Sequence, residues 1–350
     1  MKNILPLCAA IALLAAGVYA DDAPTWVTNL EQEFPSRDWV AVVAQGTSQP
    51  QAESAAMTAL ARAFRTDVES ITQSSQKFSQ IVSDTAGKST VTFDESKNFS
   101  EEVNTSTNVR GLIGVQIDVY RASDRTVYVN ARMNRRESSA RYSGMIRENT
   151  AVITTLLAAA AAAPIRSSLD VYARLGFARA LAQVTDNFQN ILEVLDPAAA
   201  DHRPAYGGAN AITTKMLECA ALITIGIAIT TERPADKTLL TRGAASFFRD
   251  LGFKTNDQGS LPNVNGNYMM RANVRFEELR QNVVSCRYYI DAALANQNGT
   301  ILFPFTEDDR KSHPRTISEA RRLAVQAAEN SFKEGKFAEE FNGWLYSLLE

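Results

Sequence analysis

The sequence predicts an α+β fold, with two small sheet-and-helix domains joined by a long helical hairpin. Apolar and polar residues alternate over 113–133 and 223–229, which predicts strands that bury one face. Between these stretches, two long segments carry apolar residues at the three- and four-residue spacing of helices. The chain has 350 residues, 45% of them apolar and 21% charged, so it can form more than one hydrophobic core. A disordered or collagen-like protein is excluded.

Residues 1–20 have the parts of a secretory signal peptide. A basic start precedes an apolar stretch over 4–18 and a small-x-small end at Ala20. The apolar stretch is shorter than the roughly twenty residues that a membrane-spanning helix needs. Cys8 follows too short an apolar core for a lipidation site. We therefore expect cleavage after Ala20, no transmembrane segment in the mature chain, and a periplasmic or otherwise exported protein of a bacterial envelope.

Residues 21–133 predict the first domain. The apolar run 39–44 predicts a strand. Ser48 and Gln51 form a capping box, which predicts the start of a helix. Apolar residues at helical spacing then follow at Ala56, Leu60, Ala63, Phe64, Val68 and Ile71.

The remainder of this domain contains a polar stretch and a hairpin. The stretch 90–108 is rich in Ser, Thr, Asn and Glu and fits a strand or a loop. The alternation over 113–120 resumes over 127–133 after a polar turn at 123–125, which predicts a β-hairpin with one apolar face.

Residues 134–212 predict a helical hairpin and a linker. One helix is expected over 138–163, where Pro164 stops it, and a second from Leu169 onward. The stretch 197–210 is rich in Pro and Gly and predicts a linker.

Residues 213–350 predict the second domain. The alternation over 223–229 predicts a strand, followed by a helix that ends at Gly252. Thr316 and Glu319 form a capping box for a later helix. Three further strands and a final apolar segment are expected over 269–276, 283–294, 300–305 and 337–348.

The first domain resembles the LPP-type lipoprotein domain of bacterial envelopes. The resemblance rests on Trp26-Val27, on the run from Trp39 to Ser48 and on the alanine-rich helix that follows. The hairpin residues Tyr120 and Tyr128 also match, whereas the family usually has Gly where Ala44 stands. The resemblance covers roughly a third of the chain and involves hydrophobic and small residues rather than chemical groups.

The second domain is similar, more loosely, to the small modules of TolB, of LpoB-type activators of penicillin-binding proteins and of the curli secretion lipoprotein. An LPP-type domain followed by a TolB-like one also resembles the flagellar protein FlgT. These relatives act by binding envelope proteins. The resemblance therefore implies flagellar, secretion or cell-wall machinery as partners, and it supplies no catalytic residues.

The sequence carries no recognised catalytic or cofactor motif. A histidine-dependent site would need His202, in the Pro/Gly linker, or His313, which precedes Pro314. Metal-ligand spacings and phosphate-binding loops are missing, and 307–309 is expected to be a solvated acidic turn. We expect a non-enzyme with no catalytic residue, no cofactor and no metal. The formal net charge of −3 does not favour nucleic acid as a partner.

Two groups of residues remain as candidates for a role. Cys219 and Cys286 form a candidate disulfide in an oxidising compartment, or two buried thiols. Basic and aromatic residues interleave at Arg271, Arg275, Arg280, Arg287, Tyr288 and Tyr289, which fits a partner-binding face or a solvated sheet face balanced by acids.

The leading hypothesis is a non-catalytic exported envelope protein that acts through protein contacts as an assembly or scaffold component, with a homo-oligomer as one option. The first alternative is a periplasmic module that binds a small ligand or lipid. A peptidoglycan hydrolase with paired carboxylates is the second, since 39 acidic residues offer many pairs.

Overall fold

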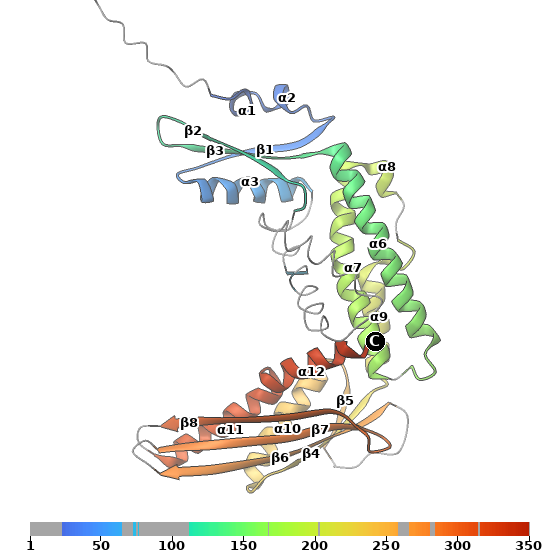
Figure 1. Cartoon of the computed structure of the whole chain (residues 1–350), viewed down its shortest axis with the longest axis vertical. Helices are drawn as coiled ribbons and strands as arrows, with labels where there is room; N and C mark the ends of the chain where they lie inside the picture. Colours follow the sequence, from blue (N-terminus) through green and yellow to red (C-terminus); the bar gives the residue numbers. More distant parts are fainter. Residues whose placement is uncertain are drawn as a thin grey trace, which may run out of the picture. The chain divides into compact units, whose positions relative to one another are not determined.

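The structure is a computed structural model, and it confirms the predicted α+β class (Figure 1). It describes residues 23–64, 73, 74, 76, 112–166, 168–201, 204–257, 266–280, 284–313 and 316–349. The predicted signal peptide, the stretch 90–108 and His202 lie outside the described residues. Contacts divide the chain into two compact units, one of Met1–Leu60 with Gln116–Met133 and one of Ala61–Val115 with Asn134–Glu350.

The first unit contains a three-stranded sheet in the order β1-β3-β2. The predicted hairpin is present, with β2 and β3 antiparallel from Gln116 opposite Arg132 to Arg121 opposite Val127. Helix α3 lies along one side of the sheet, and α1 and α2 lie on the other (Figure 1). The elements are α1 (Thr25–Thr28), α2 (Leu30–Glu33), β1 (Trp39–Gly46), α3 (Gln49–Ala63), β2 (Gln116–Arg121) and β3 (Val127–Asn134).

Helix α3 begins where the capping residues predicted it. The Gln51 side chain accepts hydrogen bonds from the backbone N–H and the hydroxyl of Thr47, at 3.0 and 2.8 Å. In the expected capping box the Gln51 side chain would bind the backbone N–H of Ser48, whereas in the structure it binds Thr47, one residue earlier. Ala52, Ala56, Met57 and Leu60 of this helix are fully buried.

The helical hairpin consists of α6 (Arg135–Ala162) and α7 (Leu169–Leu195). Helix α6 starts three residues before the predicted 138, because the Asn134 side chain caps it by accepting from the Glu137 N–H. The helices are joined inside by a buried hydrogen bond from Asn149 Nδ2 to Thr185 Oγ1 at 3.1 Å.

The prediction of a linker over 197–210 is wrong at both ends of this stretch, which are helical. The stretch contains α8 (Pro197–Ala200) and the first residues of α9 (Gly208–Ala220). The Ala209 N–H, in the first turn of α9, donates to Asp186 Oδ2 of α7 at 2.8 Å. A distant residue thus supplies a hydrogen-bond acceptor at the start of this helix, and local sequence does not show it.

The base of the hairpin packs onto the carboxyl-terminal sheet in the same unit. The Tyr172 hydroxyl of α7 donates to the Leu251 carbonyl at 2.9 Å, and the Tyr172 ring meets Phe253 edge-on. The Leu169 N–H donates to the Tyr268 hydroxyl at 3.2 Å. Gly176 leaves room for Tyr346, whose hydroxyl lies 3.2 Å from the position that a Cβ would take.

The carboxyl-terminal sheet has five strands in the order β5-β4-β6-β7-β8. Strand β4 is parallel to β5 and β6, and β6, β7 and β8 are antiparallel. Helices α10 and α11 lie along one face (Figure 1). The elements are β4 (Thr224–Thr230), α10 (Pro234–Asp250), β5 (Lys254–Asn256), β6 (Asn267–Arg280), β7 (Val284–Asn296), β8 (Ile301–His313), α11 (Ile317–Lys333), α12 (Lys336–Tyr346) and the 3₁₀ turn η2 (Ser347–Leu349).

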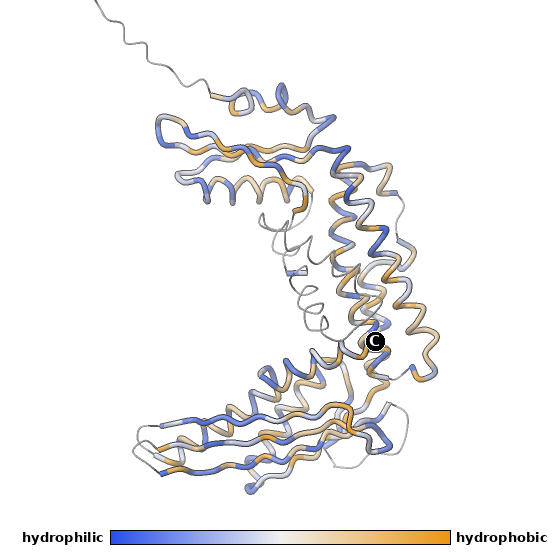
Figure 2. The backbone as a smooth tube through the Cα atoms, in the orientation of Figure 1, coloured by the Kyte–Doolittle hydropathy of each residue, from blue (hydrophilic) through white to orange (hydrophobic). Residues whose placement is uncertain are grey.

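Hydrophobic and hydrophilic residues alternate along these strands, as Figure 2 shows. Ile225, Ile227 and Ile229 of β4 are buried, as their alternation predicts. Aromatic rings fill the space between the sheet and its helices: Phe247, Phe248, Phe303, Phe305, Phe332, Phe337 and Phe341.

The acidic turn predicted over 307–309 is wrong. These residues lie within β8, which runs eight residues past the predicted end at Phe305. The Tyr288 hydroxyl donates to Glu307 Oε1 at 2.7 Å, and Arg287 pairs with Asp308. Side chains of the neighbouring strand thus bind two of the three acidic residues, which lets a charged segment continue as a strand.

Both candidate disulfide cysteines are free, buried thiols. Cys219 on α9 donates from Sγ to the Arg166 carbonyl at 3.1 Å. Cys286 lies on β7 with its side chain facing the helices. The structure therefore holds two separate thiols where the sequence allowed a disulfide.

Neither thiol is expected to react readily in the native protein. Burial raises the pKa of Cys219 and that of Cys286 from 9.0 to about 11, which lowers the thiolate population at pH 8 by roughly a hundredfold. A thiol-specific chromophoric reagent should therefore label the mature protein slowly and label both sites at once after unfolding. Rapid labelling of native protein, or a mass gain of about 2 Da on reduction, would contradict this.

Candidate functional site

The face of the carboxyl-terminal sheet opposite α10 and α11 carries charged and aromatic side chains. Side chains alternate across the strands, so burying Met270, Ala272 and Val274 of β6 beneath the helices turns Arg271 and Arg275 to the other side. We define the open face by the residues in this register: Arg271, Asn273, Arg275, Glu277, Arg287, Tyr289, Asp291, Thr306, Asp308 and Arg310.

Tyr289 lies at the centre of the open face. Its hydroxyl donates to Glu277 Oε2 at 3.0 Å, and this bond raises the pKa of Tyr289. The guanidinium carbons of Arg287 and Arg275 lie 4.8 and 5.6 Å from its ring centre. Arg287 also binds Asp308, which raises the pKa of its guanidinium. Two cations therefore stack on one aromatic ring, and two acids hold the cluster in place.

Four of the six predicted basic and aromatic residues share this face: Arg271, Arg275, Arg287 and Tyr289. Tyr288 faces the helices and is only 2% exposed, because it is one residue out of register. Arg280 follows the register of Phe276 and Glu278 and so belongs to the helix side. Asp308 and Arg310 also lie on this face, which the sequence did not predict, because it indicated a strand end at Phe305 and a turn over 307–309.

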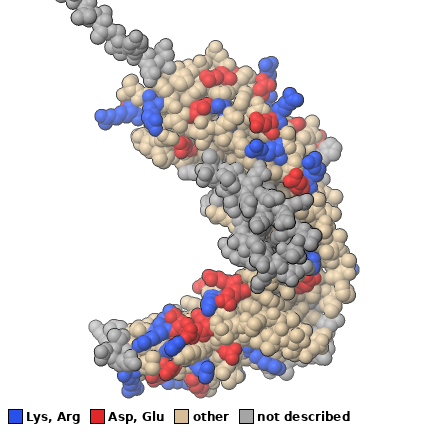
Figure 3. All heavy atoms as spheres, in the orientation of Figure 1, with Lys and Arg blue, Asp and Glu red and all other residues tan. Residues whose placement is uncertain are grey.

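Acidic and basic side chains are intermixed over the visible face of this sheet-and-helix region (Figure 3). On the open face four arginines stand beside three carboxylates, those of Glu277, Asp291 and Asp308. Such a surface favours a partner with its own pattern of both charges over a uniformly charged polymer.

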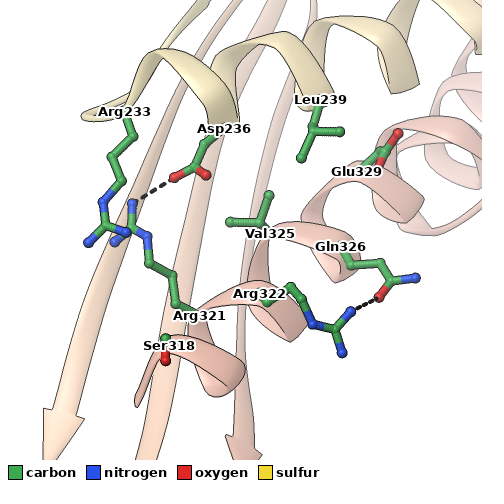
Figure 4. A pocket seen from close by; sticks show the side chains of 9 residues that line it. All are labelled: Arg233, Asp236, Leu239, Ser318, Arg321, Arg322, Val325, Gln326 and Glu329. Carbon is green, nitrogen blue, oxygen red and sulfur yellow. Dashed lines mark hydrogen bonds and ion pairs between the residues drawn. The ribbon is translucent and has the colours of Figure 1, made fainter. Parts of the chain in front are cut away.

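A second candidate is the cleft between α10 and α11, with a volume of about 380 Å³ (Figure 4). Figure 4 shows Asp236 of α10 and Arg321 of α11 pointing toward each other. Its lining residues are Arg233, Asp236, Leu239, Ser318, Arg321, Arg322, Val325, Gln326 and Glu329.

Arg321 is the buried charge of this cleft, with 7% of its side chain exposed. Its guanidinium donates to Asp236 at 2.7 Å and to Glu232 at 3.2 Å, lies 3.6 Å from Glu278, and stacks on Phe276 at 4.9 Å. Burial lowers the pKa of Arg321, but its hydrogen bonds to the two acids outweigh this and raise the pKa. These contacts hold the Arg321 side chain in one position, which is a structural role.

The carboxylates of the cleft are engaged by arginines. Asp236 binds Arg321, and Glu329 binds Arg242 at 2.8 Å. Arg322 is held by Glu319 at 2.8 Å, and Arg233 by Glu278 at 3.2 Å. This charge balance favours neither an anion nor a cation as a ligand, so we do not place the function here.

The remaining predicted groups have local structural contacts. His313 ends β8, and its Nδ1 accepts from the Thr316 N–H at 3.2 Å, next to the confirmed cap of α11 by Thr316. Within the described residues, no group of three or more His, Cys, Asp or Glu side chains could hold a metal ion. None of the described helices has the length and apolarity to cross a membrane.

No protein-family model and no curated protein matches this sequence. Among solved structures, the chain is similar to a secreted protein of Helicobacter pylori at 12% identity and a TM-score of 0.37, over 87% of this chain and 97% of that one. A minor lipoprotein of Acinetobacter baumannii matches 34% of this chain and 88% of its own, at 13% identity and a TM-score of 0.23. A DUF330 protein of Xanthomonas campestris matches 37% and 88%, at 15% identity and a TM-score of 0.25. Similarities at this level assign neither fold family nor function.

Proposed function

We propose that this chain is an exported, non-catalytic envelope protein that acts through protein–protein contacts as an assembly or scaffold component. The observation that carries the proposal is the Arg275–Tyr289–Arg287 cluster on the open face. The signal peptide over 1–20 supports export. The resemblance to LPP-type and TolB-like envelope modules supports a binding role.

The chemistry of the cluster suits a protein partner. Arginine and tyrosine are enriched at the energetic centres of protein interfaces, where they combine large contact area with hydrogen bonding. Glu277 and Asp308 already hold Tyr289 and Arg287, so little side-chain freedom is left to lose on binding. We infer an envelope protein as the partner, from flagellar, secretion or cell-wall machinery.

In-cell crosslinking should capture a specific envelope protein through the open face. A photoreactive residue at Asn273, an exposed position between Arg271 and Arg275, should trap one reproducible partner. Combining it with Arg275→Ala and Arg287→Ala should lower the yield about tenfold or more, because hot-spot residues each contribute above 1 kcal/mol.

Two controls make this experiment decisive. The same photoreactive residue at Arg249, exposed on α10, should not trap the partner, and Arg322→Ala should not lower the yield from position 273. Capture that is insensitive to the two arginine changes, or equal from position 249, would overturn the proposal for this face.

A second candidate function is binding of a small apolar ligand or lipid. It is favoured by a cavity of about 330 Å³ beside α6, α7 and α9, lined by Leu157, Ala160, Leu175 and Leu222 among others. Leu222 and the nearby Leu217 are 57% and 52% exposed. Saturable binding of a fluorescent fatty acid, abolished by Leu222→Glu, would favour this candidate.

A further inference from the structure

Strand β8 forms an edge of the five-stranded sheet and pairs with β7 alone in the described part of the chain. It is 13 residues long and lies at the border of the sheet in Figure 1. Side chains on it are well exposed, at 52% for Asp308, 45% for Asp309 and 39% for Lys311. An edge of this length offers a row of backbone groups for pairing with another strand.

Pro304 reveals which backbone groups face outward. It lies opposite Ala293 in the ladder with β7, and it has no N–H to donate. A proline fits a paired strand where its nitrogen points away from the neighbour, so positions 304, 306, 308, 310 and 312 turn their backbone groups to the free edge. The Arg310 N–H agrees, because it donates to its neighbour Asp309 Oδ1 at 2.7 Å.

The charges along β8 are arranged so that two antiparallel copies of the strand place opposite charges against each other. Three acids at 307–309 precede two cations, Arg310 and Lys311. When two copies run antiparallel about an axis at Asp309, Asp308 faces Arg310 of the second copy and Glu307 faces Lys311, each pair occurring twice.

In an antiparallel pair of β8 strands, the residues whose backbone groups face outward must lie opposite one another. The two-fold axis can therefore pass through a residue such as 308, 309 or 310, but not between two residues. An axis at position 308 would set Glu307 against Asp309. An axis at 310 would pair Asp309 with Lys311 at two places, but it would set Arg310 against itself and leave Asp308 opposite Ser312, so it forms two opposite-charge pairs where the axis at 309 forms four. Asp309, which meets its own copy at the favoured axis, is neutralised by Lys311 of its own chain at 2.6 Å. Charge therefore selects one register.

We propose that β8 pairs antiparallel with β8 of a second copy of this chain, centred on Asp309. The two five-stranded sheets then join into one continuous sheet, and their open faces become continuous. Dimer formation through the β8 edge does not require the proposed envelope partner, and it can be measured with the purified protein alone.

Charge reversal tests the pairing. Sedimentation of the mature protein at low salt should show a dimer. Asp308→Arg should raise the dimer dissociation constant at least tenfold, because the new cation at position 308 would face Arg310 of the other copy at two places in the interface. The double variant Asp308→Arg with Arg310→Asp should restore the dimer, and within each chain it places the new acid opposite Arg287. Asp291→Arg, on the open face but on β7, should leave the dimer unchanged.

A cysteine at the axis tests the register. Asp309→Cys should form an intermolecular disulfide under mild oxidation, since residues facing each other at a non-hydrogen-bonded pair have Cα atoms about 4.5 Å apart. Glu307→Cys should not, because the two copies of position 307 would lie roughly 13 Å apart. A monomeric wild type, a dimer insensitive to Asp308→Arg, or equal crosslinking at both positions would overturn the proposal.

Discussion

Replacing Arg321 by methionine is expected to lower the free energy of unfolding by about 3 kcal/mol. The substitution removes the cation that holds Glu232, Asp236 and Glu278 together, and leaves three carboxylates facing one another. Removing one partner of a buried ion pair costs about 3–5 kcal/mol. We take the lower end because Glu232 and Glu278 are 49% and 30% exposed, and water can solvate them.

The adjacent residue provides a matched control. Arg322 is 59% exposed and donates to Glu319 and Gln326, both on its own helix. Arg322→Met should therefore leave the urea concentration at the midpoint of unfolding almost unchanged. Urea unfolding followed by circular dichroism measures both. Equal losses for the two variants would show that the acids around Arg321 do not depend on it.

The second large effect is expected from glycine-to-alanine changes of opposite sign in two helices. A Cβ on Gly243 of α10 would lie 2.8 Å from the Glu329 backbone oxygen and 2.9 Å from its Cγ. The backbone of α11 would have to move, so Gly243→Ala should cost about 2 kcal/mol despite the higher helix propensity of alanine. Gly144 of α6 has nothing within 4 Å of that position, so Gly144→Ala should stabilise by about 1 kcal/mol.

Thermal unfolding of the two variants separates packing from propensity. Both substitutions add one methyl group in mid-helix, so any common effect on the unfolded chain cancels in the comparison. A rise in melting temperature for both variants would mean that α10 and α11 can move apart at little cost. A fall for both would contradict the open surroundings of Gly144.

Sequence patterns predicted the elements whose determinants are local. The strand around Ile225 to Ile229 and the helix capped by Thr316 needed only alternation and a cap. The pattern failed where distant residues decide the structure. Helix α9 starts with help from Asp186 of α7, and the charged half of β8 is a strand because β7 pairs with it.

The candidate site divides in the same way. The alternation of side chains along a strand was enough to predict several basic and aromatic residues on one face of the sheet, and four of the six share that face. The acidic residues around Arg321 had no signal in the sequence, because Glu232 and Asp236 lie around the start of α10, Glu278 lies on β6, and Arg321 itself lies on α11. The sequence likewise did not indicate that β8 would form the edge of the sheet, because alternation predicts a strand but not its neighbours.

The contacts at the foot of the hairpin limit how this chain can be divided or exchanged. Tyr172, Leu169 and Gly176 all tie α7 to the carboxyl-terminal sheet and its last helices. Dividing the gene between residues 212 and 213 would separate the two sides of this interface and expose both of them to solvent. Recombination should therefore pass the hairpin and the sheet on together, as a single inherited module.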